Sequence, residues 1–435
     1  MTLPIVAVVG RPNVGKSTFV NRIIQAQTAI VHPESGVTRD RSYHRADWNG
    51  REFMLVDTGG IEFTADDTFG ASIRDQAVTA AREADVVILI VDGSAGVAPG
   101  DEEVAALLRR GQTPVFLVVN KLDTPGREEA VHDFWPLGLG QPWPVSALHG
   151  HGSGDLLDAI VDALPAATEY AESEAIGVAV IGKPNAGKSS LYNRLLGRER
   201  SIVSEVAGTT RDAIDTLLED GETVFRMVDT AGLRRKSQID ESVEYYGFVR
   251  AMRAIDRADV AVLVIDGVTG VTDQDQRVAR FAEERGCGIV IALNKWDLVE
   301  GPEAKADVVA RLADKLGFVG YAPVIRTSAL TGAGVHRVLP MVRTVYEAFS
   351  CEIPTSALNR MLGELRAAGH TISKGGAMLR LKYVTQTGTK PPVFTFFANH
   401  PRMVDANYER YLENRLRESF DLTGTPVRLR FRAKG

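Results

Sequence analysis

The stretch Ile5-Val-Ala-Val-Val-Gly-Arg-Pro-Asn-Val-Gly-Lys-Ser17 recurs as Gly177-Val-Ala-Val-Ile-Gly-Lys-Pro-Asn-Ala-Gly-Lys-Ser189, 172 residues further along the chain. Each copy is a run of apolar, mostly β-branched residues, typical of a buried parallel strand, followed by the pattern G-x-x-x-x-G-K-S. The glycines allow backbone N–H groups to converge on phosphate oxygens, and a following helix adds its positive dipole end. The stretch therefore predicts two strand–loop–helix units that bind phosphate.

The side chains of each phosphate loop have distinct expected roles. Lys16 and Lys188 are expected to neutralise the β- and γ-phosphates of a nucleotide, and the hydroxyls of Ser17 and Ser189 to coordinate Mg²⁺. The other expected contacts of the two loops are Gly10, Asn13, Gly15 and Thr18 in the first and Gly182, Asn185, Gly187 and Ser190 in the second.

A second motif, Asp-x-x-Gly, also occurs twice. Asp57-Thr-Gly-Gly60 returns as Asp229-Thr-Ala-Gly232, and each Asp comes at the end of an expected strand. A carboxylate at that place can hold the coordination shell of Mg²⁺, and the N–H of the glycine can contact the γ-phosphate and move when it leaves.

A threonine lies 22 residues after each phosphate-loop lysine, at Thr38 and Thr210, and can complete the Mg²⁺ shell from a loop. The pattern alone is weak, but its recurrence at the same offset favours the assignment. The predicted metal ligands are Ser17, Thr38, Asp57, Ser189, Thr210 and Asp229. The residues expected to act in hydrolysis are Lys16, Asn13, Thr38, Gly60, Lys188, Asn185, Thr210 and Gly232.

The motif that selects the base is Asn120-Lys-Leu-Asp123, which returns as Asn294-Lys-Trp-Asp297. One carboxylate can accept both N1–H and the N2 amino group of guanine, whereas adenine lacks this donor pair and would leave the carboxylate unsatisfied at a cost of several kcal/mol. GTP is therefore the predicted nucleotide. The predicted contacts are Asp123 and Asp297 to the base edge, Asn120 and Asn294 bracing the loop, Lys121 and Lys295 along the base plane, and Ser146-Ala147 and Ser328-Ala329 at guanine O6.

Strand-length apolar runs alternate with amphipathic helical patterns through both repeats. This alternation predicts α/β domains, each a mostly parallel sheet with helices on both faces. Ligands of such sheets bind at the carboxyl ends of the strands, where the motifs above are found. The predicted units are GTP-binding domains over 1–166 and 176–350, an acidic linker over 167–175, and a third domain over 351–435.

The composition is that of an ordinary globular protein, with 44% hydrophobic and 24% charged residues. The apolar runs are too short to span a membrane. Met1-Thr-Leu-Pro4 leads directly into the first strand, so we expect no signal peptide and a cytoplasmic location. Cys287 and Cys351 match no metal or disulfide spacing, and both are expected to be buried thiols in a reducing compartment.

The net charge of −6 hides an asymmetry along the chain. Residues 351–435 carry 14 Lys and Arg against 7 Asp and Glu, which gives +7. Residues 1–350 carry 36 basic against 49 acidic residues, which gives −13. A basic segment beside acidic domains favours a polyanionic partner, with RNA preferred to DNA; the alternative is a merely solvated positive face.

The basic segment is predicted to be an α+β domain with the order helix, strand, strand, helix, strand. Met378–Val384 and Val393–Ala398 are the first two expected strands. The last strand alternates Val427, Leu429 and Phe431 with Arg428, Arg430 and Arg432. The arginine face is expected either to contact structured rRNA or to pack on an acidic neighbouring domain.

The repeated motifs resemble those of the P-loop GTPases. Two copies followed by a small basic domain resemble the bacterial ribosome-assembly GTPases of the Der (EngA) family, over essentially the whole chain. This resemblance implies two G domains and a KH-like domain acting on the precursor of the large ribosomal subunit and its rRNA, and we expect a monomer. The G-x-x-G loop with which KH domains clamp RNA is missing between residues 351 and 435, which puts ordinary single-strand recognition in doubt.

The chain departs from Ras-type GTPases at the residue after Asp-x-x-Gly. Ile61 and Leu233 stand where those enzymes have a glutamine that orients the attacking water. Asn13 and Asn185 resemble the asparagine that helps other GTPases bind K⁺ beside the phosphates. K⁺-stimulated hydrolysis is therefore our hypothesis, and the alternative is that these asparagines only brace the loop.

The surroundings of the two motifs also differ. Arg234-Arg-Lys236 follows the second Asp-x-x-Gly, whereas the acidic stretch 62–67 follows the first. The basic cluster can clamp RNA or dock on a neighbouring domain in one nucleotide state, or be merely solvated. We therefore expect two sites that are not interchangeable.

Three functions are open at this point. The favoured one is a GTP-driven switch in ribosome assembly. A constitutive RNA-binding scaffold with one structural GTP is the second. A GTPase at a membrane surface is the third, and it lacks support because no basic amphipathic helix or lipidation motif is found.

Overall fold

The computed structural model describes most of the chain in segments separated by gaps. The described residues are 3–28, 43–57, 77–78, 80–81, 84–123, 127–165, 175–197, 203–207, 214–228, 243–367, 373–374 and 377–433. The chain divides into two units, Met1–Tyr170 with Ile239–Val249, and Ala171–Gln238 with Arg250–Gly435. The finer domain boundaries that the sequence predicts stay predictions.

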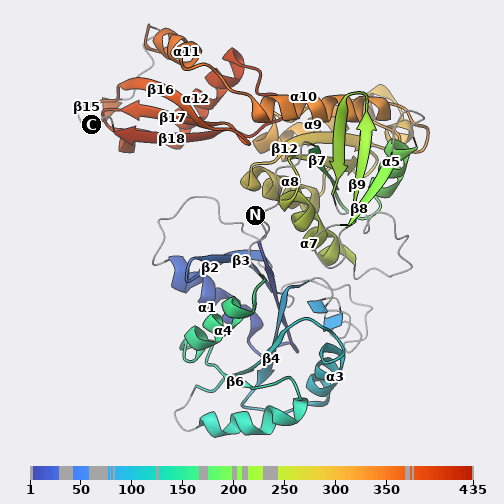
Figure 1. Ribbon diagram of the computed structural model, residues 1–435, viewed down its shortest axis with the longest axis vertical. Coiled ribbons are helices and arrows are strands. Elements are labelled where there is room, and N and C mark those ends of the chain that lie inside the picture. The colour runs from blue at the N-terminus through green and yellow to red at the C-terminus, as the bar shows by residue number, and fades with distance from the viewer. Residues whose placement is uncertain are drawn as a thin grey trace. The chain divides into compact units, whose positions relative to one another are not determined.

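The first unit is built on a six-stranded sheet with the order β2-β3-β1-β4-β5-β6 (Figure 1). All neighbouring strands are parallel except β2 and β3. Its elements are β1 (Ile5–Val9), α1 (Lys16–Thr28), β2 (Tyr43–Trp48), β3 (Arg51–Asp57), β4 (Val86–Asp92), α3 (Pro99–Leu108), β5 (Val115–Asn120), η2 (Arg127–Leu137), β6 (Trp143–Pro144) and α4 (Ser153–Ala163).

The core of this sheet follows from the strand sequences. Every residue of β1 is buried, as expected for a strand covered on both faces. Val6 and Val8 lie in one apolar cluster with Phe19 of α1 and Ile160 of α4. The cluster fixes α1 against the sheet, so the phosphate loop between β1 and α1 is held at both ends.

The second unit contains a sheet of seven strands with the order β13-β12-β11-β7-β10-β9-β8. Strands β8 and β9 are antiparallel additions at one edge, and the other pairs are parallel apart from β9 with β10. Its elements up to residue 350 are β7 (Ile176–Ile181), α5 (Lys188–Leu196), β8 (Val203–Ala207), β9 (Ile214–Asp220), β10 (Thr223–Met227), β11 (Val260–Asp266), α8 (Asp273–Arg285), β12 (Gly288–Asn294), η3 (Trp296–Leu298), α9 (Pro302–Lys315), η4 (Gly317–Val319), β13 (Val324–Arg326), η5 (Val335–Arg337) and α10 (Val338–Ser350). Helix α7 (Val243–Asp256) belongs to the first unit up to Val249 and to the second from Arg250.

The C-terminal domain has a three-stranded sheet with the order β16-β17-β18, in which β16 and β17 are antiparallel and β17 and β18 parallel. Helices α11 and α12 supply Leu358 and Leu412 to its apolar cluster. The elements are α11 (Thr355–Ala367), β14 (Ser373–Lys374), β15 (Ala377–Met378), β16 (Leu381–Gly388), β17 (Val393–Ala398), η6 (Pro401–Met403), α12 (Ala406–Ser419) and β18 (Arg428–Ala433).

Two expectations about this part of the chain need correction. The strand predicted from Met378 begins only at Leu381, because Met378 pairs with Ser373 in the small β14–β15 sheet and its carbonyl accepts a hydrogen bond from the Asn399 side chain. Cys287 is buried as predicted, but Cys351 is only partly buried because it lies in the connection between α10 and α11.

The C-terminal domain is joined to the preceding sheet by direct hydrogen bonds. The N–H of Ile289, near the start of β12, donates to the carbonyl of Gly424 at 2.7 Å, and the N–H of Gly424 donates to the carbonyl of Tyr321 at 3.0 Å. Gly424 has φ +70°, and a Cβ there would lie 2.3 Å from a methyl group of Val345 in α10. Only glycine satisfies both the backbone conformation and the close approach.

Arg428 adds a polar contact to the same junction. Its guanidinium donates to the carbonyls of Glu283 and Glu284 at 2.6 and 3.0 Å and to the carboxylate of Glu283 at 3.1 Å. Because these carbonyls belong to the last turn of α8, the arginine adds a donor at the helix end, where the carbonyl of Glu283 also accepts from the N–H of Gly286 at 3.0 Å, and it complements the helix dipole. Arg417 lies over the ring of Tyr321, with 4.3 Å from its guanidinium carbon to the ring centre.

None of the helices in the described part of the chain is long and apolar enough to cross a lipid bilayer.

Candidate nucleotide-binding sites

The two phosphate loops have nearly the same backbone conformation. Asn13 and Asn185 have φ of +64° and +60°, a region that asparagine tolerates better than most residues. A Cβ on Gly10 would lie 2.3 Å from the carbonyl oxygen of Ile90, and one on Gly182 would lie 2.3 Å from that of Val264. Glycine is therefore required where each loop passes the neighbouring strand.

The second glycine of each loop faces the base-selecting motif. A Cβ on Gly15 would lie 2.3 Å from Nδ2 of Asn120, and one on Gly187 would lie 2.1 Å from Nδ2 of Asn294. The structure therefore brings the phosphate loop and the base motif of each domain into direct contact, although more than 100 residues separate them in the sequence.

The asparagines of the base motif connect three segments in each domain. Asn120 donates from Nδ2 to the carbonyl of Val14 at 2.8 Å and accepts at Oδ1 from the N–H of Ala147 at 2.9 Å. Asn294 makes the corresponding bonds to Ala186 and Ala329, both at 2.9 Å. Both asparagines are buried, so the loss of these bonds would leave unpaired polar groups inside the protein.

The phosphate-loop lysines lie folded back on their own loops. Nζ of Lys16 donates to the carbonyls of Gly10 and Arg11 at 2.8 Å, and Nζ of Lys188 donates to the carbonyl of Lys183 at 2.7 Å. Burial lowers the pKa of Lys16, an effect that the charge of Asp57 opposes, and lowers that of Lys188 to about 8. A buried ammonium with few anionic partners favours the arrival of phosphate.

Two of the predicted Mg²⁺ ligands are adjacent in the first domain. The hydroxyl of Ser17 donates to Oδ2 of Asp57 at 2.6 Å, and Asp57 is only 1% exposed. A hydroxyl and a carboxylate are oxygen donors of the kind that Mg²⁺ prefers, so this pair fits the ion. Among the described residues no group of three His, Cys, Asp or Glu side chains offers another metal site.

Several predicted site residues lie outside the described part of the chain. They are Thr38, Gly60, Thr210, Asp229 and Gly232, together with Ile61, Leu233, Arg234–Lys236 and the acidic stretch 62–67. Their assigned roles stay predictions.

The base-edge carboxylates are exposed at the surface of each domain. Asp123 accepts a short hydrogen bond from the hydroxyl of Ser146, which itself accepts from the N–H of His149 at 3.1 Å. In the second domain the hydroxyl of Ser328 accepts from the N–H of Thr331 at 3.1 Å, and Asp297 is likewise exposed. The first carboxylate is therefore held by the loop that is predicted to contact guanine O6.

Two aspartates that belong to none of the sequence motifs bind the lysines of the base motif. Nζ of Lys121 lies 2.6 Å from Oδ2 of Asp92, and Nζ of Lys295 lies 2.7 Å from Oδ2 of Asp266. Both lysines have left-handed backbones, with φ of +68° and +57°. Anchoring the ammonium fixes the direction of the aliphatic stem, which is the part expected to pack on guanine.

The aspartates are themselves held by their own loops. Asp92 accepts from the N–H and the hydroxyl of Ser94, and Asp266 accepts from the N–H groups of Val268 and Thr269. Partial burial opposes the charge of Asp92, but the hydrogen bonds from Lys121 and Ser94 outweigh it and lower the pKa of the carboxyl. The sequence contained a clue, because both aspartates end a strand before a glycine and lie 174 residues apart.

The two sites differ in the contact between the phosphate loop and a neighbouring helix, which is α3 in the first domain and α8 in the second. Arg11 makes a two-pronged ion pair with Asp101 of α3, at 2.8 and 3.0 Å, and Asp101 is 1% exposed. In the second domain Lys183 takes the place of the arginine. Asp275, the counterpart of Asp101, caps α8, and its Oδ1 is buried without a hydrogen-bond partner in the described residues. The second phosphate loop is therefore less firmly fixed.

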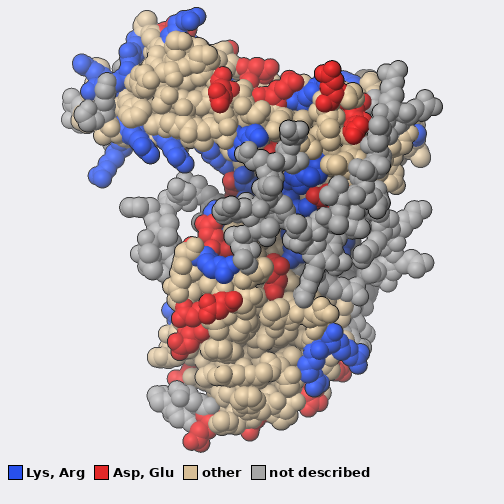
Figure 2. All heavy atoms as spheres, in the orientation of Figure 1, with Lys and Arg blue, Asp and Glu red and all other residues tan. Residues whose placement is uncertain are grey.

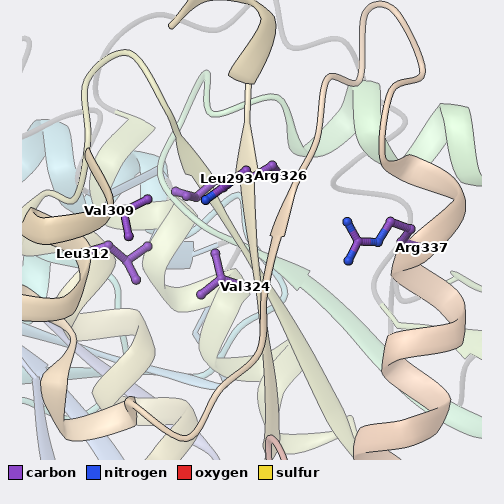
Figure 3. A pocket seen from close by; sticks show the side chains of 6 residues that line it. All are labelled: Leu293, Val309, Leu312, Val324, Arg326 and Arg337. Atoms are coloured by element: carbon purple, nitrogen blue, oxygen red, sulfur yellow. The ribbon is translucent and has the colours of Figure 1, made fainter. Parts of the chain in front are cut away.

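The base motif of the second domain makes an additional cation–π contact, and a cavity lies beside it. Arg326 lies over the ring of Trp296, with 5.1 Å from its guanidinium carbon to the ring centre, whereas the first domain has Leu122 in place of the tryptophan. A cavity of about 230 Å³ beside Arg326 contains none of the predicted nucleotide contacts (Figure 3). It is lined by Leu293, Val309, Leu312, Val324, Arg326 and Arg337.

Nucleotide binding at the second site should take up protons at pH 8 to 9. Part of the Lys188 population is neutral there, and phosphate would raise the pKa of the amine, so affinity should fall as pH rises through this window. Calorimetric titration with GDP at pH 8.5, in buffers of different ionisation enthalpy, measures the uptake. It should shrink at pH 6.5 and in Lys188→Met, and an enthalpy independent of buffer at pH 8.5 would contradict this assignment.

Removal of the Asp92 carboxylate that binds Lys121 should weaken nucleotide binding without slowing GTP hydrolysis. Asp92→Asn should raise KM for GTP at the first site by on the order of threefold to thirtyfold, because a charge-assisted but partly exposed bond is lost. The kcat should not change, because the contact lies at the base. Measurements in a Lys188→Met chain isolate the first site.

The matched control is a double-mutant cycle with Lys121→Met. Asp92→Asn should have no further effect in that variant if the aspartate acts through the lysine. Additive effects of the two substitutions, or a fall in kcat at constant KM, would show that Asp92 has another role.

Comparison with known proteins agrees with this geometry. The family described as "50S ribosome-binding GTPase" matches residues 5–121 and 177–295, and the family described as "KH-domain-like of EngA bacterial GTPase enzymes, C-terminal" matches residues 352–432. The predicted fold class, two G domains and a KH-like domain, is thereby confirmed.

Proteins named GTPase Der match the chain over its whole length. The one from Moorella thermoacetica is 49% identical over 99% of this chain and 99% of its own length. Those from Desulforudis audaxviator and Pelotomaculum thermopropionicum are 48% and 49% identical over 100% of this chain and 99% of their lengths. The chain binds and hydrolyses GTP as a member of the GTPase Der (EngA) family, with two G domains and an EngA-type KH-like domain.

Proposed function

We propose that this protein is a cytoplasmic, monomeric GTP-driven switch that acts in the assembly of the large ribosomal subunit. GTP would order the loops that contain Thr38 and Thr210, and hydrolysis would release them. Support comes from two phosphate loops of nearly the same backbone conformation in one chain, from relatives named GTPase Der, and from a matching family described as 50S ribosome-binding.

The observation that carries the proposal is the path from the second nucleotide site to the C-terminal domain. Strand β12 ends in Asn294 of the base motif and begins beside Ile289, which is hydrogen-bonded to Gly424. The basic domain is therefore attached to the strand whose last residue, Asn294, begins the predicted guanine-binding motif. A particle bound to that domain and a nucleotide bound to this strand share one rigid element.

The metal ions have assigned places in this proposal. Mg²⁺ would be held by Ser17 and Asp57 in the first site, with Ser189 and Asp229 as counterparts in the second, and would neutralise charge on the phosphates. K⁺ would be held beside Asn13 and Asn185, whose exposed side chains follow left-handed turns of the loop. A cation there would stand in for the positive charge that other GTPases take from an arginine.

The ribosomal role predicts binding that depends on the nucleotide. Cosedimentation with large-subunit precursors should differ between a GTP analogue and GDP, and Lys16→Met and Lys188→Met should each abolish the response to their own site. A constitutive scaffold would give the same cosedimentation with either nucleotide. Equal binding in all states by the wild-type chain would therefore reject the switch.

The role of K⁺ predicts a dependence of turnover on the monovalent cation. GTP hydrolysis in KCl should exceed that in NaCl at equal ionic strength by about tenfold or more, because one positive charge near the transition state is worth several kcal/mol. Asn13→Ala and Asn185→Ala should remove the difference site by site. Equal rates in the two salts would leave the asparagines as loop braces only.

A further inference from the structure

In the described part of the C-terminal domain, helices α11 and α12 pack on one face of the sheet, and neither packs on the other face. Phe394 and Phe396 of β17 point into the apolar cluster formed with α11 and α12 and are fully buried. Because side chains alternate along a strand, Val393, Thr395 and Phe397 project from the opposite face. We call this second face the open face.

An aromatic pair and an arginine lie in one row across the open face. Tyr383 of β16 pairs with Phe397 of β17, and Phe397 pairs with Arg432 of β18. The two rings have centroids 5.9 Å apart and are tilted by 48°. Tyr383 is 39% exposed, although an aromatic side chain of this size is usually better covered.

The next row of the open face is polar. Thr395 pairs with Thr385 on one side and with Arg430 on the other, and its hydroxyl lies 2.9 Å from that of Thr387. Arg430 and Arg432 are exposed, and no carboxylate of the described residues lies within ion-pair distance of either one. Lys382, at the irregularity of β16, is also exposed.

The three arginines of β18 therefore have different partners. Arg428 is bound to the end of α8 in the second G domain, as one of the two sequence hypotheses expected. Arg430 and Arg432 extend along the open face beside the aromatic pair. Figure 2 shows Lys and Arg side chains projecting from the part of the domain that contains β18.

We propose that the open face binds a single-stranded segment of RNA, with bases stacked on Tyr383 and Phe397 and phosphates bound by Arg430 and Arg432. The proposal deepens the ribosomal function proposed above and rests on it. The exposed ring of Tyr383 and the partly buried ring of Phe397 lie beside two arginines that form no ion pair with the described residues, and together they match the flat bases and the charged backbone of a nucleotide strand. The exposed hydroxyl of Thr387, beside the buried Thr395, supplies a hydrogen-bond donor and acceptor.

The chemistry of the face favours a single strand over the alternatives. In a duplex the bases are stacked on each other and cannot reach the rings. An acidic peptide would satisfy the arginines but would leave the aromatic pair without a stacking partner. The face also offers a mode of binding that needs no G-x-x-G loop, which residues 351–435 lack.

The test measures fluorescence anisotropy of a labelled ten-nucleotide RNA without self-complementarity, titrated with the full chain. Tyr383→Leu should weaken binding by about 5- to 150-fold, because stacking on one aromatic contributes about 1–3 kcal/mol per base. Tyr383→Trp should keep the affinity, and its fluorescence should be quenched by RNA. Arg430→Gln and Arg432→Gln should each reduce the slope of log K against log salt by about 0.7.

Matched controls lie outside the open face. Trp135 is 50% exposed in the first G domain, and Arg343 is exposed on α10, so Trp135→Leu and Arg343→Gln should leave affinity and salt slope unchanged. Equal affinity of Tyr383→Leu and wild type would overturn the proposal. Equally tight binding of a duplex of the same sequence, or a loss in the control variants as large as in Tyr383→Leu, would also overturn it.

Cosedimentation with large-subunit precursors separates this proposal from the function on which it rests. If Tyr383→Leu binds both the oligonucleotide and the precursor normally, stacking on the open face is wrong while the ribosomal function stands. If the wild-type chain binds the oligonucleotide through Tyr383 but binds no precursor in any nucleotide state, the ribosomal function is wrong while the RNA site stands.

Discussion

The rest of the structure depends on one buried amide in each G domain. Asn120 and Asn294 each donate to the phosphate loop and accept from the loop at the end of the next strand, so one side chain sets the distance between the phosphate and base subsites. Glycine at Gly15 and Gly187 follows from this contact, because a Cβ would occupy the space of the amide. The geometry for a whole nucleotide is thus fixed by the interior of the protein.

Other contacts at the phosphate loop and at the base motif differ between the two domains. The first phosphate loop is connected to α3 by the ion pair of Arg11 with the buried Asp101, whereas the second has a lysine in place of the arginine and an aspartate with one oxygen that has no hydrogen-bond partner in the described part of the chain. The second base motif gains the contact of Arg326 with Trp296 instead. The first site therefore has an additional ion pair at the phosphate loop, and the second has an additional cation–π contact beside the base motif.

Much of this could be predicted from sequence, and the failures have physical causes. Motifs with fixed spacing placed the loops at the strand ends, and alternation along β18 separated its arginines from the apolar residues. Asp92 and Asp266 were missed because a lone aspartate after a strand belongs to no motif until its lysine partner is seen. The separation of Arg428 from Arg430 and Arg432 depends on a helix end 145 residues away, which alternation along one strand does not reveal.

The contact of Arg428 with α8 has a consequence for where the chain can be cut. A fragment that ends at Ser350 would lose the hydrogen bonds of Arg428 to the carbonyls of Glu283 and Glu284 and the acceptor of the Ile289 N–H. It would also uncover Val345, which Gly424 covers. We therefore expect the second G domain to fold stably only together with the residues that follow it. A truncation that isolates this domain is accordingly better placed before β7 than after α10.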